Sequence, residues 1–215
     1  DAEEFQLAED SIEKALAINK EHPEAWAYRA VIAHFESEHD RERQAHETSL
    51  KHWKSNFRVE HLIGKKLSQK YRFKEGATYQ RRALDANPEF SKAQIQLAQD
   101  LLRLGDEEEG WTWAARAHDK DGYNVTAYNL VTLKTTLDEY KTLETDSFIV
   151  RMPAEEAPIF GNQVLDLLEE AKQVLSAKYG VELERRIIIE LFGNQKDFGV
   201  RTFGMPHNPG FLGVC

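Results

Sequence analysis

The side chains that could carry chemistry in this chain are its histidines, its adjacent carboxylates and a dense group of lysines and arginines. Eight histidines raise the question of a metal site. His34 and His39 are five residues apart and His46 and His52 are six apart. Neither spacing places two rings on one face of a helix, as a spacing of four would. We therefore expect these histidines to be solvated or to cap helices.

The remaining catalytic signals are weak. The carboxylate pairs at 155–156 and 169–170 point in different directions along a chain and are expected to be surface charge. No glycine-rich phosphate loop and no serine nucleophile elbow is present. Residues 46–50 begin like a zinc-binding His-Glu-x-x-His helix, but Leu50 stands where the second histidine must be. We expect no catalytic residue, metal site or cofactor in this chain.

The charge is distributed unevenly along the sequence. The net charge is −9, yet residues 51–82 carry ten basic and two acidic side chains, interleaved with aromatic residues. Three interpretations are open: the cations pair with acidic helices of neighbouring repeats, they bind an acidic peptide or protein, or they bind nucleic acid. The acidic total disfavours nucleic acid.

The elements that position these side chains follow a 34-residue period, which is typical of stacked helix–turn–helix units. Small residues recur where two helices could cross closely, and large apolar residues recur beside them. The matched positions are Ile63 with Leu97, Gly64 with Ala98, Leu67 with Leu101, Gly76 with Gly110 and Ala83 with Ala117.

A known repeat pattern has its Trp, small residue, Ala and Pro at the positions of Trp26, Ala30, Gly64, Ala83 and Pro88. Residues 1–140 therefore resemble the tetratricopeptide (TPR) family, although Glu42 and His46 replace a small and an aromatic residue. The resemblance implies a mainly α protein, with an α-solenoid of about three to four helix-turn-helix repeats. It also implies a protein or peptide partner in a concave groove.

In TPR proteins the first helix of each repeat lines this groove. In the present register it contributes Tyr28, His34, Arg58, His61, Lys65, Lys92, Gln96, Gln99 and Arg103. Some family members clamp a terminal carboxylate with a set of lysines and asparagines. The asparagines are missing at the matching positions here, so chaperone tails are not the expected partner.

The pattern changes after residue 143. A strand near 148–150, an amphipathic helix over 157–179 and strands over 185–192 and 210–215 predict a partial α+β domain in the order strand-helix-strand-strand. Such a unit cannot bury both faces of its sheet, so we expect the rest of this domain to lie elsewhere. We place the domains at 1–143 and 144–215.

A second resemblance rests on the order of short motifs in this region: Phe148-x-Val150-Arg151, Ile189-Glu190-x-Phe192, Val200-Arg201-Thr202 and Gly210-Phe211-x-Gly213-Val214-Cys215. Residues 144–215 are similar to the start of the peptidase-MA-like (gluzincin) metallopeptidase domain, which follows TPR arrays in some bacterial proteins. The resemblance implies an N-terminal fragment of a zinc metallopeptidase. The zinc and the His-Glu-x-x-His helix would belong to the full-length parent, downstream of Cys215.

Three functions follow as alternatives. The chain is a non-catalytic scaffold that binds a protein or peptide or packs on its own downstream domain, or the peptidase fragment just described, or a homo-oligomer that completes its sheet by pairing. We expect neither a membrane span nor a secretory signal, and the single cysteine allows no internal disulfide. Cytoplasmic and periplasmic locations both remain open.

Overall fold

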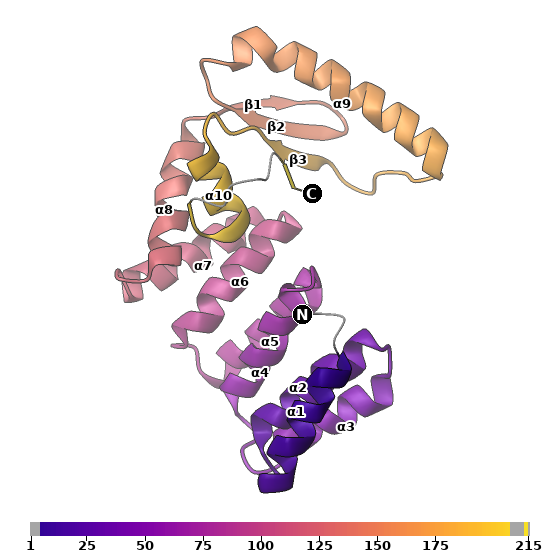
Figure 1. The fold of residues 1–215 in the computed structure, drawn as a ribbon. Helices are drawn as coiled ribbons and strands as arrows, with labels where there is room; N and C mark the ends of the chain where they lie inside the picture. Colours follow the sequence, from indigo (N-terminus) through magenta and orange to yellow (C-terminus); the bar gives the residue numbers. More distant parts are fainter. Residues whose placement is uncertain (1–4, 207–212, 215) are drawn as a thin grey trace. The chain divides into compact units, whose positions relative to one another are not determined.

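The computed structural model describes residues 5–206 and 213–214, in two compact units divided between residues 121 and 122 (Figure 1). The first unit holds the helices α1 (Phe5–Ile18), α2 (Pro23–Phe35), α3 (His39–Ser49), α4 (Phe57–Ser68), α5 (Phe73–Ala86), α6 (Ser91–Leu104) and α7 (Glu107–Lys120). The second holds α8 (Val125–Asp138), β1 (Lys141–Glu144), β2 (Phe148–Met152), α9 (Ala157–Tyr179), β3 (Ile187–Glu190) and α10 (Gln195–Phe203).

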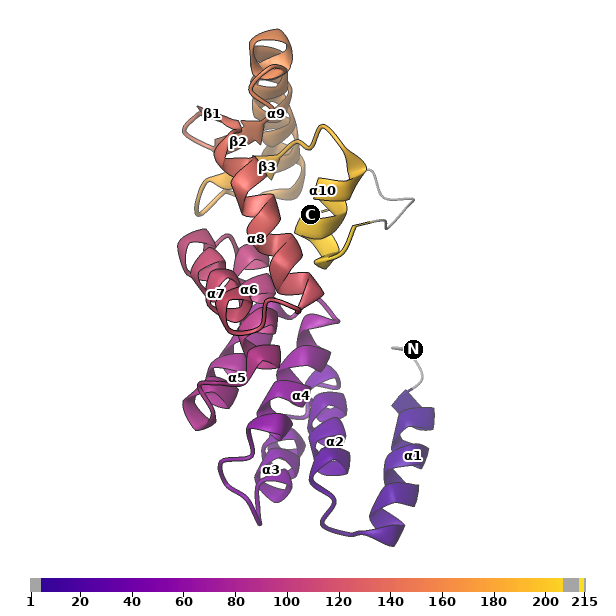
Figure 2. The same ribbon diagram turned by 90° about the vertical axis from the view of Figure 1, so that its left-hand side faces the viewer.

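The helices of the first unit form consecutive pairs, α2 with α3, α4 with α5 and α6 with α7 (Figure 2). Each pair also packs on the next one, because α2 lies against α4 and α5 against α6. The fold class predicted from the sequence is confirmed: the protein is mainly α, with TPR-like helix pairs followed by a small mixed sheet. The apolar residues at the repeat positions are buried, among them Ile63 and Leu97.

The two helices of a pair cross where one of them carries glycine. A Cβ atom on Gly76 of α5 would collide with Ser68 Oγ of α4, and one on Gly110 of α7 would come within 2.9 Å of Leu102 of α6. Gly76 and Gly110 are 34 residues apart, as are Ser68 and Leu102. The repeat period therefore describes a real, recurring contact between helices.

In the first pair, this crossing is polar. His34 and Glu42 occupy the positions there that Ser68 and Gly76 occupy in the next pair. His34 Nδ1 lies 3.1 Å from the Glu42 carboxylate, which also accepts a hydrogen bond from the Tyr79 hydroxyl at 3.4 Å. His46 lies one turn further along and its Nε2 is 3.0 Å from Glu60. The expectation that His34 and His46 are solvated or cap helices is therefore wrong. Their place in the repeat register puts them between helices, where each ring needs a hydrogen-bond partner.

The second unit contains a three-stranded sheet in the order β1-β2-β3. β1 runs antiparallel to β2, and β3 runs parallel to it, with Val150 opposite Leu143 on one side and Ile189 on the other. Helix α9 packs on β2, and α10 packs on α8, where Asn129 Nδ2 donates to the backbone carbonyl of Gly204 at 3.1 Å. β2 is long enough to alternate buried and half-buried residues.

The residues that form strands differ from the prediction in two places. Residues 141–144 form β1, which the sequence pattern did not predict, because four residues carry too little periodicity to show their pairing with β2. The strand predicted over 185–192 is confined to 187–190. The strand predicted over 210–215 lies outside the described residues, apart from Gly213 and Val214, which have no regular structure.

The domain division at 143/144 stays a prediction. The compact units divide earlier, and α8 belongs with the second one because it packs on α10. Within the described part of the chain, no helix is both long and apolar enough to cross a membrane.

Gly64 offers a test of the close crossing. Replacing glycine by alanine inside a helix normally stabilises it by about 1 kcal/mol. In Gly64→Ala the new Cβ would lie 2.6 Å from Gln80 Nε2 and 2.9 Å from Tyr79 Cβ, so we expect the sign to reverse. The free energy of unfolding in urea should fall by about 1–3 kcal/mol. Thr78→Ala, on the exposed side of α5, is the matched control and should leave stability nearly unchanged.

Candidate functional site

A basic groove lies along the first helices of the repeats. Five of the nine residues predicted to face the groove line a single pocket of about 500 Å³: Tyr28, Arg58, His61, Lys65 and Lys92. The pocket is completed by Glu24, Leu62, Lys66, Gln69 and Phe90. Half of these ten residues come from α4, where spacings of three and four place them on one face.

The other four predicted residues do not line this pocket. His34 is turned toward α3, and Gln96 donates to Asp100 on its own helix at 2.9 Å. The Arg103 guanidinium lies over the ring of Phe73, 5.6 Å from its centroid, and Gln99 is half-buried. His34 and Arg103 thus contact a neighbouring helix, and Gln96 contacts its own.

The pocket is positively charged. It contains four cations, Arg58, Lys65, Lys66 and Lys92, and one carboxylate, Glu24. The cation of Lys66 lies 5.7 Å from the centre of the Tyr28 ring.

His61 adds a neutral polar group to this pocket. Burial lowers the pKa of His61 below its ordinary value. The hydrogen bond with Gln80 raises the pKa and so opposes this effect, whereas the charges of Lys65 and Lys92 lower it further. His61 Nδ1 is 2.8 Å from Gln80 Oε1, which can only accept, so this nitrogen carries the proton. The ring also packs edge-on against Phe90, with centroids 5.2 Å apart. At neutral pH His61 therefore contributes shape and hydrogen bonding, and the positive charge comes from the lysines and arginine.

The basic band seen in the sequence divides into two groups. Two cations outside the pocket pair with carboxylates: Lys51 with Glu21, in the turn before α2, and Arg81 with Glu109 of α7, where Arg81 Nη2 lies 2.7 Å from Glu109 Oε2. Within the described residues, Arg58, Lys65 and Lys92 form no ion pair with a carboxylate. The pairing interpretation therefore accounts for Lys51 and Arg81 and does not account for the cations in the groove.

An apolar cleft of about 700 Å³ adjoins the basic groove. Its walls are α1, α2 and α4, and the residues it shares with the basic groove are Glu24, Tyr28, Lys66 and Gln69. Its apolar lining includes Phe5 and Ile12 from α1 and Val31 and Phe35 from α2. The sequence does not predict this cleft, because its shape depends on how side chains of α1, α2 and α4 pack together.

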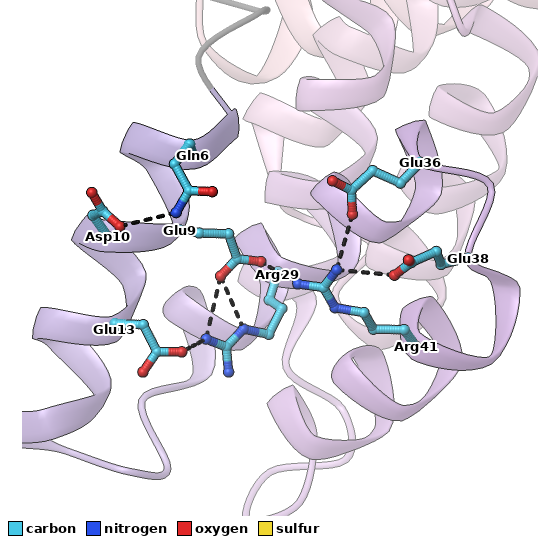
Figure 3. Close-up of polar contacts among 8 residues, drawn as sticks. All are labelled: Gln6, Glu9, Asp10, Glu13, Arg29, Glu36, Glu38 and Arg41. Atoms are coloured by element: carbon cyan, nitrogen blue, oxygen red, sulfur yellow. Dashed lines mark hydrogen bonds and ion pairs between the residues drawn. The ribbon is translucent and has the colours of Figure 1, made fainter.

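An ion-pair network holds α1 in this position (Figure 3). Arg29 of α2 donates to Glu9 at 3.3 Å and also to Glu13, while Arg41 of α3 donates to Glu9, Glu36 and Glu38. The hydrogen bond to Glu38 and the charges of the neighbouring glutamates raise the pKa of Arg41. The acidic excess of residues 1–50 was the only sequence signal of this network, and it could not show which carboxylates converge.

No described residues form a metal site. Within residues 5–206 and 213–214, no group of three or more His, Cys, Asp or Glu side chains could hold an ion. His46, the first residue of the partial zinc motif, is bound to Glu60. The peptidase resemblance places its zinc on a His-Glu-x-x-His helix beyond Cys215, and the described residues hold no such group of ligands.

No protein-family model matches the chain, and no curated protein matches it. Among solved structures it is similar to pilF of Pseudomonas aeruginosa, with 19% identity and a TM-score of 0.45 over 62% of this chain and 63% of that one. It is also similar to YrrB, described as a TPR protein with an unusual peptide-binding site, with 17% identity and a TM-score of 0.44 over 63% and 71% of the two chains. The match thus spans 63% of the pilF chain. At these identities the similarity concerns the fold.

Asp100, the partner of Gln96, is the most strongly perturbed acid beside the groove. It is 1% exposed, and burial raises its pKa to about 7. The hydrogen bonds from Gln96 and Ser68 lower the pKa and only partly offset the effect of burial. Ser68 Oγ lies 2.9 Å from the Gly64 carbonyl and 2.8 Å from Asp100 Oδ2, but its hydroxyl has one proton. A protonated Asp100 can donate to Ser68, which then donates to Gly64, so all three groups are satisfied.

We expect stability to depend on pH through Asp100. Because the folded protein keeps this proton to about pH 7 and the unfolded chain loses it near 3.8, stability should fall as pH rises through this window. The fall is about 1.4 kcal/mol for each unit of pKa difference. Asp100→Asn, which mimics the protonated acid, should flatten the profile in urea unfolding from pH 5 to 8.

The exposed acid Asp85 supplies the control for this measurement. Asp85→Asn should keep the wild-type pH profile. A wild-type decline that persists unchanged in Asp100→Asn would show that another group is responsible.

Proposed function

We propose that the first unit is a non-catalytic scaffold that binds an acidic segment of a protein in the basic groove. The observation that supports this is the convergence of Arg58, Lys65 and Lys92 on one pocket, without carboxylate partners among the described residues. Exposed cations gathered in a concave site attract carboxylates and raise their local concentration. The acidic segment can belong to another protein or to a downstream domain of the same polypeptide.

The groove offers such a segment more than charge. Lysine and arginine side chains reach carboxylates from both sides, because Lys65 comes from α4 and Lys92 from α6. The rings of Tyr28 and Phe90 provide apolar surface between them. We infer that the preferred ligand is an acidic stretch that also carries a large apolar residue.

A peptide-display selection against residues 1–215 tests the proposal. We expect the selected peptides to be enriched in Asp and Glu. The double variant Lys65→Glu, Lys92→Glu should weaken binding of the best peptide by about tenfold or more, measured by fluorescence anisotropy at 0.15 M salt. Two lost attractions and two new repulsions account for that magnitude.

The matched control reverses the same number of charges in the basic band but outside the pocket, as Lys54→Glu and Lys74→Glu, both at exposed positions. This control should retain binding to within a factor of about two. Equal weakening by both double variants would reject the groove as the site. Tighter binding of a single-stranded oligonucleotide than of any selected peptide would favour the nucleic-acid alternative.

A second candidate function is that residues 144–215 begin a peptidase-MA-like domain and the chain is part of a bacterial zinc metallopeptidase. Three residues of the motifs that resemble this family meet in the second unit. Glu190 of β3 lies 2.6 Å from Arg201 Nε and 3.5 Å from Arg151 Nη1, and all three side chains are largely buried. This supports a shared role for the motif residues in holding one fold, and leaves the chemistry to residues outside the described chain.

Metal analysis of the longest reading frame that contains this chain tests the second candidate. We expect about one equivalent of zinc per chain, because a His-Glu-x-x-His helix binds one ion with a further ligand. The zinc should be lost when the first histidine of such a motif is replaced by alanine. A protein without bound zinc would contradict this candidate and leave the scaffold proposal unaffected.

A further inference from the structure

His61 is the one histidine among the described residues that line the pocket of the basic groove. The amide of Gln80, which is fully buried in α5, determines which of its ring nitrogens is available. Gln80 Nε2 donates to the backbone carbonyl of His61 at 3.3 Å, so Oε1 is the atom that faces the ring, 2.8 Å from Nδ1. Because that oxygen can only accept, Nδ1 keeps its proton and Nε2 is the nitrogen that titrates. Nε2 has no hydrogen-bond partner among the described residues.

The charges around His61 disfavour the imidazolium form in the free protein. The charged groups of the pocket are Arg58, Lys65 and Lys66 of α4, Lys92 of α6 and Glu24 of α2, while α5 contributes the neutral Gln80. Burial lowers the pKa of His61 below its ordinary value of 6.5, the hydrogen bond with Gln80 opposes this effect, and the charges of Lys65 and Lys92 lower it further. At neutral pH the ring therefore carries a lone pair on Nε2.

An acidic segment bound in the groove reverses this preference. Carboxylates that reach Lys65 and Lys92 offset the two charges that hold the pKa of His61 down. A carboxylate beside Nε2 is repelled by its lone pair, but it accepts a charge-assisted hydrogen bond once this nitrogen is protonated. The imidazolium is thus favoured in the complex and disfavoured in the free groove.

We propose that His61 determines which acidic segments the groove retains, by taking one proton from the solvent when a segment places a carboxylate beside Nε2. Binding then strengthens as the pH falls below neutral. The inference rests on the proposed function, because it requires an acidic segment in this groove. It adds the contact at Nε2 and the dependence on pH, neither of which the charge of the lysines would produce.

The sign of the pH dependence follows from linkage. The pKa of His61 is higher in the complex than in the free protein. The additional affinity is therefore fully present below the free pKa and is lost as the pH rises through the pKa of the complex. Because the free value lies below 6.5, the change falls between about pH 5.5 and 8. The carboxylates of the ligand ionise near about pH 4 and stay charged throughout this range.

Asp100 is a second source of pH dependence with the same sign. It lies on α6, is hydrogen-bonded to Gln96 and to Ser68 of α4, and has a pKa of about 7. Its negative charge above that pH would repel an acidic ligand. Asp100 is buried and does not line the pocket, so its effect has to be separated from that of His61 by experiment.

The probe is a peptide of sequence Asp-Glu-Phe-Asp-Glu with an amidated C-terminus, labelled with tetramethylrhodamine. It has the acidic and aromatic character inferred for the ligand. Fluorescence anisotropy with the full chain at low salt should show binding that is about tenfold tighter at the acidic end of the range than at the basic end. A rise of about one unit in the pKa of His61 accounts for that factor.

Three single variants identify the group that titrates. His61→Asn keeps an amide that can donate to Gln80 but does not titrate, so its affinity should not depend on pH. His39→Asn is the matched control, because it makes the same change at an exposed position of α3 outside the pocket, and it should keep the wild-type profile. Asp100→Asn should also keep that profile.

A direct measurement on the wild-type protein covers the case in which His61→Asn does not fold. The Cε1–H signal of His61, assigned through bonds from the backbone, is titrated by NMR with and without the peptide. We expect the pKa of His61 to rise by about one unit on binding. An unchanged pKa overturns the inference without reference to any variant.

The outcomes distinguish this inference from the proposed function. Binding that is lost in Lys65→Glu, Lys92→Glu but has the same pH profile in the wild type and in His61→Asn overturns the inference and leaves the proposed function standing. Loss of the pH dependence in Asp100→Asn assigns it to that acid and also overturns the inference. A peptide that does not bind, or that binds equally well to Lys65→Glu, Lys92→Glu, removes the proposed function and the inference together.

Discussion

The close crossing of the two helices in each pair is the contact on which the rest of the repeat unit depends. At Gly64 and Gly76 there is no room for a Cβ atom, so α4 and α5 pack with their backbones in near contact. This closeness brings each pair within reach of the next, with α2 against α4 and α5 against α6. The first helices can then present their remaining faces side by side, and the groove is a consequence of that arrangement.

Polar groups buried beside these crossings make the core more specific than an apolar one would be. The pairs His34–Glu42, His46–Glu60 and Ser68–Asp100 each join two different helices. A buried polar group that loses its partner costs free energy, so a shifted register would be penalised at every one of these positions. The same burial makes Asp100 sensitive to pH near neutrality, which an apolar crossing would not be.

The groove combines two kinds of surface in one continuous site. Its basic part acts over a distance of about one Debye length, ~8 Å at physiological salt, and has little preference for ligand conformation. Its apolar part lies between α1, α2 and α4 and favours an apolar ligand surface. Tyr28 and Lys66 belong to both parts, so a ligand held at one would lie beside the other. The site is thus suited to a segment that is acidic on one side and apolar on the other.

The sequence by itself determined the repeat architecture. The 34-residue period and the small residues at the crossings record contacts between neighbours in the chain, and such contacts leave a regular trace in the sequence. The same register puts Arg58, Lys65 and Lys92 on first helices of the repeats, and the three residues line one pocket. It also located the helix over 157–179, whose length and amphipathic pattern are unambiguous.

Only the tertiary structure decided which side chains remain available. It turned His34 and Gln96 away from the pocket, joined His46 to Glu60, and paired β1 with β2. It also placed α1 across the apolar cleft through ion pairs that span 16 to 32 residues of sequence. These outcomes depend on which of several equally charged or equally apolar groups come within contact distance. That choice is made by packing between distant segments, and residue type and spacing do not record it.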